Sequence, residues 1–221
     1  MENIVQIISI KDITHNVKRF RVTKPAGYHF NAGQATELSI NAPGWKEEKR
    51  PFTFTSLNND SFLEFTIKIY NDHQGVTNHL DMLQKGDELI LRDVWGAIEY
   101  KGPGYFIAGG AGITPMLAIL RQLHQYGQLE GNKLFFSNQT DQDIILHDEL
   151  QDMLCQNVIF TTTRQNDVAH DHRRIDAAFL QAEVKNFDKH FYVCGPDQMV
   201  SAINEALKLE GVTPDYLVFE Q

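Results

Sequence analysis

The sequence predicts an antiparallel β-barrel followed by an α/β domain with a parallel sheet. Short strand patterns separated by turn residues fill the first hundred residues, and some alternate apolar with polar side chains, as residues 19–22 do. From Gly102 onward, strand and helix patterns alternate, which indicates parallel strands joined by crossover helices. The break at 101–104 predicts two domains, 1–101 and 102–221.

In the first domain, we expect six strands and one short helix. The strands cover residues 4–10, 17–22, 35–40, 52–55, 62–70 and 88–92, and the helix covers 76–83. Turn signals stand between them, at residues 25–27, 41–44 and 58–60. Because short strands joined by turns favour an antiparallel sheet that closes on itself, this pattern predicts a small barrel.

In the second domain, strands alternate with helices. The strands cover residues 105–108, 133–137, 158–161, 190–194 and 216–219, and the helices cover 113–126, 147–154, 175–183 and 197–210. Parallel sheets bind ligands at the carboxyl ends of their strands. Glycine-containing turns at Gly109 and Gly195 fall at such ends, so we expect a binding site there.

The composition is typical of a soluble globular protein, with 42% hydrophobic and 22% charged residues. We expect a cytoplasmic protein with no membrane association, because the N-terminus does not resemble a signal peptide. The net charge of −9, without a basic stripe, argues against a nucleic-acid partner. Two cysteines cannot supply the four thiolates of an iron–sulfur cluster, and the pair His170 and His172 is more typical of a solvated loop than of a metal site.

The segment from Tyr105 to Leu120 is the strongest sign of a ligand. It reads as an apolar strand, a loop with three glycines, and a helix that begins at Thr114 as N-cap and Pro115 in the first turn. Glycine permits close backbone approach, and a helix N-terminus favours an anion, so the segment predicts a phosphate site. A tight turn before a packed helix is the alternative, because the loop does not fit Gly-x-Gly-x-x-Gly.

Four motifs occur along the chain in a fixed order. They are Arg50-Pro-Phe-Thr53, Gly75-Val-Thr-Asn-His-Leu80, Gly109-Gly-Ala-Gly-Ile-Thr-Pro115 and Cys194-Gly-Pro196. Together they resemble the ferredoxin–NAD(P) reductase family over nearly the whole chain. The resemblance implies an FAD-binding barrel, a Rossmann-like NAD(P)-binding domain, and FAD-dependent reductase activity with NAD(P)H as electron donor.

The resemblance implies specific flavin contacts in the barrel. Arg50 takes the position that contacts the FAD pyrophosphate, and Phe52 stands where the family usually has a tyrosine against the flavin ring. Thr53 takes the position of the catalytic hydroxyl near the reactive ring nitrogen, and Thr77 takes a phosphate-binding position. Further cofactor-binding positions are implied at Pro51, Ile67, Lys68, Gly75 and Val76.

In the second domain, the resemblance implies a nucleotide site and two more catalytic residues. Cys194 would align the nicotinamide, and Glu220 would relay protons near the flavin. Family members often end in an aromatic residue that covers the flavin; here Gln221 stands last, and Phe219 is the candidate substitute. The nucleotide would be lined by Gly109, Gly110, Gly112, Thr114, Asn138, Gln139, Cys194, Gly195 and Pro196.

The choice of nucleotide depends on the residues just after the second strand of this domain. NADPH users often have an arginine where this chain has Gln139, so we expect NADH. Arg164, Arg173 and Arg174 could reach the same pocket, which leaves NADPH possible. The family favours FAD over FMN, although no adenine-binding motif is recognisable.

The electron acceptor is expected to be a separate ferredoxin, flavodoxin or oxygenase component, or a small molecule. The acidic net charge disfavours a large basic docking face, although Lys46, Lys49 and Arg50 near Lys68 could form a local one. Two alternatives stay open. The chain could be an NAD(P)H:flavin oxidoreductase with flavin as its substrate, or a non-catalytic electron-transfer subunit.

Overall fold

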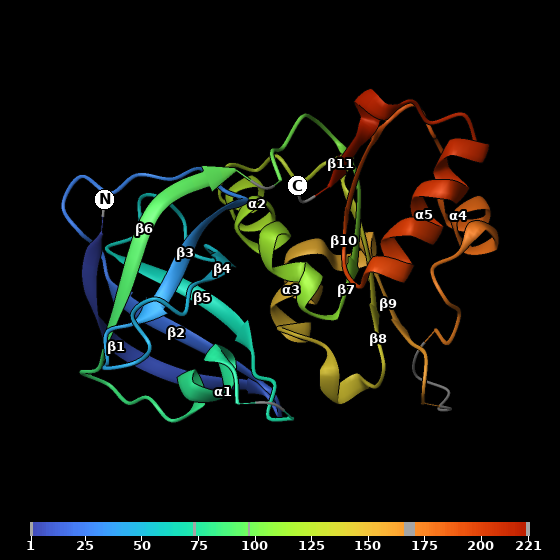
Figure 1. The fold of residues 1–221 in the computed structure, drawn as a ribbon. Coiled ribbons are helices and arrows are strands. Elements are labelled where there is room, and N and C mark those ends of the chain that lie inside the picture. The colour runs from blue at the N-terminus through green and yellow to red at the C-terminus, as the bar shows by residue number, and fades with distance from the viewer. Residues whose placement is uncertain (1, 73, 97, 166–170, 220–221) are drawn as a thin grey trace.

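A computed structural model describes residues 2–72, 74–96, 98–165 and 171–219. Figure 1 shows an antiparallel sheet and a parallel sheet side by side, with helix α2 (Thr114–Gln125) between them. Residues 3–96 supply the first sheet and residues 104–219 supply the second. The division into domains at 101 and 102 stays a prediction, and the two sheets lie on either side of it.

The antiparallel sheet has six strands in the order β4-β3-β6-β1-β2-β5. Its edge strands meet where the backbone N–H of Thr55 donates to the carbonyl of Glu64 at 2.8 Å, and this contact gives the sheet its barrel-like form. Phe20, Phe54 and Phe65 fill the interior. The elements are β1 (Asn3–Thr14), β2 (Val17–Thr23), β3 (Gln34–Ile40), β4 (Arg50–Thr53), β5 (Phe62–Lys68), α1 (Val76–Asp81) and β6 (Glu88–Gly96).

The parallel sheet has five strands in the order β11-β10-β7-β8-β9. Its strands are β7 (Gly104–Gly109), β8 (Lys133–Asn138), β9 (Val158–Thr162), β10 (His190–Cys194) and β11 (Leu217–Phe219). The remaining helices are α3 (His147–Leu154), α4 (Ala177–Glu183) and α5 (Asp197–Leu209). The structure thus confirms the predicted fold class.

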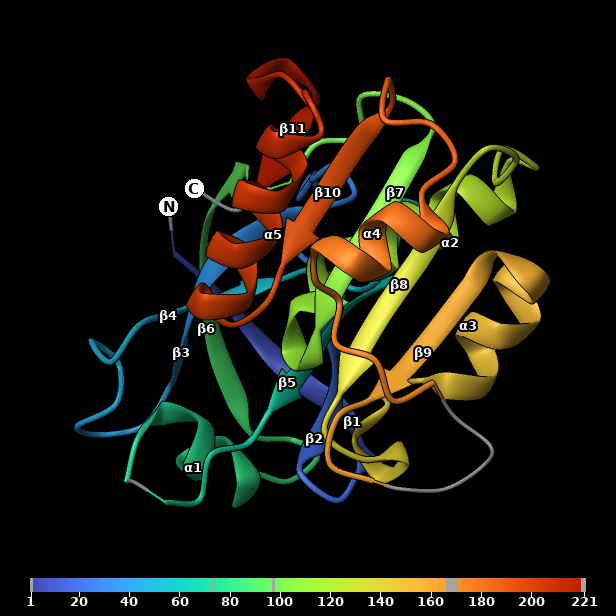
Figure 2. The ribbon, with the colours of Figure 1, turned by 90° about the vertical axis from the view of Figure 1, so that its right-hand side faces the viewer.

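Helices cover both faces of the parallel sheet, as Figure 2 shows. Phe106 and Ala108 of β7 pack in the core beneath α2 and α3, whereas Tyr105 and Ile107 pack beneath α4 and α5. This double burial explains why β7 is a continuous apolar run. The core beneath α2 also includes Val17 of the barrel, so α2 packs against both sheets.

Several element ends differ from the sequence-based expectation. β1 extends to Thr14 through two register irregularities against β2, and β6 extends to Gly96. Thr114 is not an N-cap, because its hydroxyl donates to the carbonyl of Ala111 at 3.0 Å inside a 3-10 turn that precedes α2. Pro115 does stand in the first turn of α2, as predicted.

Tyr192 of β10 anchors the segment between the two sheets. Its hydroxyl accepts hydrogen bonds from the backbone N–H groups of Lys101 and Gly102, at 2.9 and 3.0 Å, and donates one to the carbonyl of Gly102. Burial raises the pKa of Tyr192 to about 12, so the hydroxyl stays protonated. The connection between the domains is therefore fixed to the parallel sheet.

Candidate functional site

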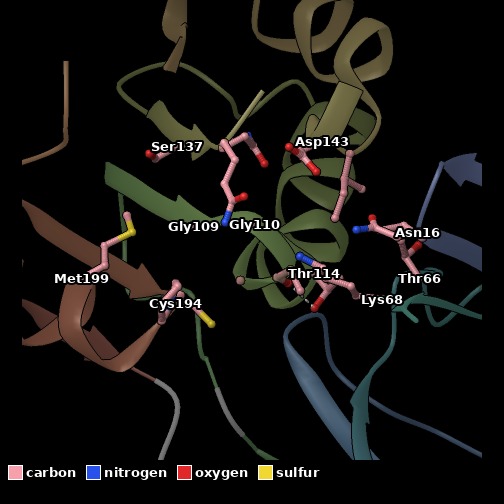
Figure 3. A pocket seen from close by; sticks show the side chains of 18 of the residues that line it. Asn16, Thr66, Lys68, Gly109, Gly110, Thr114, Ser137, Asp143, Cys194 and Met199 are labelled. Atoms are coloured by element: carbon pink, nitrogen blue, oxygen red, sulfur yellow. Dashed lines mark hydrogen bonds between the residues drawn. The ribbon is translucent and has the colours of Figure 1, made fainter. Parts of the chain in front are cut away.

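A pocket of about 1200 Å³ lies between the barrel and the parallel sheet. The barrel wall comes from the β1–β2 turn, β4, β5 and α1, and the opposite wall comes from the segments just after β7, β8, β9 and β10. Figure 3 shows Asn16, Thr66 and Lys68 of the barrel across from Cys194 and Met199. The pocket therefore lies at the carboxyl ends of the parallel strands, where α/β sheets bind ligands.

Two glycine-containing turns form the centre of the second wall, because β7 and β10 are neighbours in the sheet. A Cβ on Gly112 would lie 2.3 Å from the carbonyl oxygen of Cys194, and one on Gly109 would lie 2.9 Å from Cδ of Pro196. These glycines are thus required by the packing of one turn on the other. Gly110 is different: its φ is +53°, and a Cβ there would meet nothing within 4 Å.

The N-terminus of α2 points into this pocket, because Thr114 and Pro115 are among the lining residues. A 3-10 turn over Gly110–Ile113 leads into α2, and the backbone N–H of Thr114 donates to the carbonyl of Ala111 within it. The first backbone N–H groups of such a helical segment have no intrahelical partner, and the helix dipole adds partial positive charge. Together with the open space beside Gly110, this end of α2 is suited to a phosphate or another anion.

Asn138 ends β8 and lines the pocket. Asn138 is only 5% exposed, yet neither Oδ1 nor Nδ2 of its side chain has a hydrogen-bond partner among the described residues. A buried amide without partners is costly, so it indicates a group that binds in the pocket and offers both a donor and an acceptor. A ribose or a nicotinamide carboxamide meets this requirement.

Cys194 is the last residue of β10 and is buried. Its sulfur atom points toward the space between the two walls (Figure 3). Cys155, the other cysteine, is exposed at the end of α3 and does not line the pocket. The two thiols thus differ in environment.

The barrel wall is formed by neighbouring positions of β4 and β5. Phe52 and Thr53 line it from β4, and Thr66 and Lys68 line it from β5. Thr53 is buried at this surface, and Lys68 adds a positive charge to it. An aromatic face, a hydroxyl and a cation on one wall are suited to a planar ring that carries an anionic tail.

Most of the predicted site residues meet in this one pocket. They are Pro51, Phe52, Thr53, Ile67, Lys68, Thr77, Gly109, Gly110, Gly112, Thr114, Asn138, Gln139, Cys194, Gly195 and Pro196. Of the arginines considered for the nucleotide, Arg164 and Arg174 also line it. Arg173 instead pairs with Asp171 and Glu183. The roles of these residues stay predictions.

A few predicted residues lie elsewhere. Arg50 does not belong to the described lining of the pocket. Its guanidinium instead donates to the carbonyl of Lys49 at 2.6 Å and lies 3.6 Å from the carboxylate of Glu48. Gly75 and Val76 are also outside the lining, and Val76 packs in the barrel core. At the chain end, Phe219 is the last residue of β11, and Glu220 lies outside the described residues.

Other lining residues were not anticipated. Asp143 approaches His15 of the barrel, with 3.7 Å between its carboxylate and Nε2. Polar residues in a hairpin turn, such as His15 and Asn16, look like ordinary surface residues in a sequence, whereas Ser137 could have been found from its place at a strand end. The unanticipated set includes His15, Asn16, Val17, Thr66, Tyr70, Ser137, Asp143, Ile145, Thr163, Asp176, Gln198, Met199 and Ala202.

Among the described residues, no group of histidine, cysteine, aspartate and glutamate side chains could hold a metal ion. Within the same part of the chain, no helix combines the length and apolar character needed to cross a membrane.

Comparison with known proteins identifies both halves of the chain. Residues 4–100 match the family model of the oxidoreductase FAD-binding domain, and residues 106–205 match that of the oxidoreductase NAD-binding domain. The reductase component of propane 2-monooxygenase from Rhodococcus jostii is 25% identical, over 98% of this chain and 62% of its own length. NADH-cytochrome b5 reductase 1 from Aspergillus terreus is 31% identical, over 91% of this chain and 75% of its own length.

The fold is shared with solved structures as well. A ferredoxin NADP⁺ reductase from Neisseria gonorrhoeae with bound FAD and NADP superposes with a TM-score of 0.82 at 21% identity, over 95% of this chain and 92% of that one. The chain spans about three fifths of the Rhodococcus relative and of the rat and human NADH-cytochrome b5 reductases 1. By its two matched domains and its fold, the chain belongs to the ferredoxin–NAD(P) reductase-like family of FAD- and NAD-binding oxidoreductases.

Proposed function

We propose that the chain is an FAD-dependent reductase that takes electrons from NAD(P)H and passes them to a separate acceptor. The observation that carries the proposal is one pocket that is lined both by Thr53 of the FAD-binding barrel and by Cys194 of the NAD-binding domain. Two cofactors that react with each other must meet where both domains contribute walls. The flavin, when bound, supplies the chemistry that accepts a hydride and releases electrons one or two at a time.

Each wall has a distinct task in this proposal. Phe52 packs against the flavin ring, and the hydroxyl of Thr53 offers a hydrogen bond at its reactive edge. The N-terminus of α2 binds the anionic part of the nucleotide, and Asn138 satisfies its buried amide on the nucleotide. Cys194 holds the nicotinamide at reacting distance, which is a positional contribution.

An oxygenase component is the acceptor we favour, because one relative is named the reductase component of propane 2-monooxygenase. Lys49 and Arg50, considered as part of a basic docking face, pair with Glu47 and Glu48 at 3.6 Å each. These acids offset much of their charge, which disfavours docking by a broad basic surface. A ferredoxin, a flavodoxin or a small-molecule acceptor is the competing assignment.

Anaerobic titration of the purified, dialysed protein tests the proposal. We expect the flavin's visible band to remain after dialysis and to bleach on addition of stoichiometric NADH. Loss of colour on dialysis, with reduction of added flavin, would instead support an NAD(P)H:flavin oxidoreductase. A protein that reduces neither bound nor added FAD or FMN would leave only the non-catalytic electron-transfer subunit.

We propose NADH as the preferred nucleotide, with NADPH accepted through Arg164 and Arg174. Replacing both arginines with alanine should raise KM for NADPH by about 10-fold or more, since charge-assisted hydrogen bonds to a 2′-phosphate contribute ~1.5–3 kcal/mol. KM for NADH should change less than about twofold. Steady-state assays with both nucleotides measure this difference.

Arg173→Ala is the matched control, because Arg173 pairs with Asp171 and Glu183 outside the described lining. It should leave both KM values unchanged. Equal increases for NADH and NADPH in the double variant would assign Arg164 and Arg174 to a part that both nucleotides share.

Asn138→Leu should increase stability while it weakens nucleotide binding. Leucine has a similar volume and removes the buried amide, whose unpartnered atoms cost about 1–3 kcal/mol in the ligand-free protein. The same change removes the hydrogen bonds proposed to the nucleotide, so its Kd should rise by roughly 10-fold. Urea denaturation and calorimetric titration with NAD⁺ measure the two effects. A decrease in stability together with unchanged Kd would contradict the assignment.

A further inference from the structure

An ion cluster built around the buried carboxylate of Glu64 joins the two domains, and Arg121 and Glu149 in it are partly exposed. Arg121 extends from α2, and its guanidinium donates to both carboxylate oxygens of Glu149 on α3, at 2.6 and 3.0 Å. The remaining NH1 group reaches across to the barrel, where it donates to Oε1 of Glu64 at 2.8 Å and to the carbonyl of Thr55. Glu149 thus fixes the guanidinium plane, and the free side of that plane binds the barrel.

Glu64 is held by more than one cation. It is 2% exposed, and its other carboxylate oxygen lies 2.9 Å from Nε of Arg21 and 3.7 Å from Nε of Arg19. Burial alone would raise the pKa of Glu64, but Arg121, Arg21 and Arg19 outweigh burial and hold the pKa below its ordinary value. The carboxylate is therefore charged, and removal of a partner would leave a buried charge less well compensated.

The cluster is connected to both walls of the pocket. On one side, Arg121 and Thr114 belong to the same helix, whose first turn lines the nucleotide side of the pocket. On the other side, the hydroxyl of Thr55 donates to Oε1 of Glu64 at 3.1 Å and lies 3.2 Å from the hydroxyl of Thr66, which lines the barrel wall. Thr55 also follows Thr53, a residue of the barrel wall, by two positions. The ion cluster therefore connects the two walls of the pocket.

We propose that Arg121 and Glu64 form an interdomain clamp that sets the separation between the two walls of the pocket. These are the barrel wall, where the flavin would bind, and the opposite wall, which is called the nucleotide wall below. For the reductase function proposed above, on which this inference rests, Arg121 is a positioning residue that touches neither cofactor. Arg121 donates to the carboxylate of Glu64 and to the carbonyl of Thr55, and these directional contacts restrict how α2 lies against the barrel. Buried polar contacts require one geometry, whereas apolar contacts between flat surfaces tolerate several.

The clamp can be tested by a distance measurement that does not depend on activity. Spin labels are attached to Cys155, which is exposed on the second domain, and to a Lys85→Cys variant, which is exposed on the barrel. For the labelling, Cys194 is replaced by alanine in every protein compared, because its sulfur points into the pocket and would otherwise be a third labelling site. Double electron–electron resonance then compares the label separation with and without Arg121→Met, which keeps the volume and removes the charge.

We expect one narrow distance distribution in the parent and a broadened or displaced distribution with Arg121→Met. Lys133→Met is the matched control, because Lys133 bridges Glu183 at 3.3 Å within the second domain; it should leave the distribution unchanged. If Arg121→Met does not fold, Arg121→Lys replaces it, since a single ammonium cannot form the bidentate pair with Glu149 while also reaching Glu64. An unchanged distribution in a folded Arg121 variant would overturn the clamp.

The kinetics of flavin reduction provide a second test of the clamp. With Arg121→Met, the rate of flavin reduction at saturating nucleotide should fall about 10-fold, while KM changes less than about twofold, because alignment is lost and the nucleotide contacts are not. Equal loss in Lys133→Met would show a general stability effect and contradict the clamp. A parent protein that is not reduced by any nucleotide would refute the reductase function alone, and the distance distributions would still decide on the clamp.

Discussion

Gly112→Ala should destabilise the second domain by about 3 kcal/mol, at the upper end of what overpacking costs. The added Cβ would lie 2.3 Å from the carbonyl oxygen and 2.5 Å from the carbonyl carbon of Cys194. Both contacts are to backbone, so no side-chain rotation can relieve them. The turns after β7 and β10 must separate, which also distorts the pocket wall. We therefore expect a lower midpoint of urea denaturation and weaker nucleotide binding.

Gly127→Ala is the control within the same domain. Gly127 has a φ of +64° and no atom within 4 Å of an added Cβ, so only the left-handed backbone opposes the substitution. That strain costs about 1–2 kcal/mol. A Gly112 variant no less stable than the Gly127 variant would contradict the close packing of the two turns.

Cys194→Ala should lower the rate of flavin reduction by roughly 100-fold at saturating NADH, the size of effect expected from a misplacement of about 1 Å. The thiol lies at the end of β10 with its sulfur directed between the walls. Alanine leaves an empty space where the thiol would hold the nicotinamide in place. The alignment of the nicotinamide should therefore be impaired more than the affinity for NADH. Stopped-flow bleaching of the flavin band gives the rate, and its dependence on NADH concentration gives the affinity.

Cys155→Ala separates this effect from a general loss of thiols. Cys155 is exposed outside the described lining, so its replacement should leave the rate unchanged. Equal rates for Cys194→Ala and the parent protein would show that Cys194 serves packing alone. Thermal denaturation of both variants shows whether any rate loss reflects unfolding.

The fold and the centre of the site follow from local signals in the sequence. The apolar run of β7 and its glycine turn are adjacent in the chain, and Cys194-Gly-Pro196 repeats the same strand-to-turn transition. Because β7 and β10 are both parallel strands, their turns had to emerge at one edge of a common sheet. Short-range patterns and sheet topology together therefore brought these residues to one pocket.

The parts that could not be predicted depend on contacts between distant residues. Arg121 and Glu64 are 57 positions apart, and each looks like an ordinary surface charge in its own segment. Arg50, by contrast, pairs with a residue close to it in the chain, because its guanidinium lies near the carboxylate of Glu48. Glu48 is only two positions away, so this ion pair could have been expected from the sequence. Thr114 lost its expected capping role because a 3-10 turn precedes α2 and offers the carbonyl of Ala111.

The strand order has a consequence for how the chain acquires its structure during synthesis. All six strands of the barrel lie within residues 3–96, so the barrel can fold before the ribosome has completed the parallel sheet. Glu64 then already has Arg19 and Arg21 as partners, and its carboxylate is compensated before Arg121 reaches it. The parallel sheet grows outward from β7, first through β8 and β9 on one side and later through β10 and β11 on the other. The nucleotide wall is therefore completed last, against a flavin domain that is already in place.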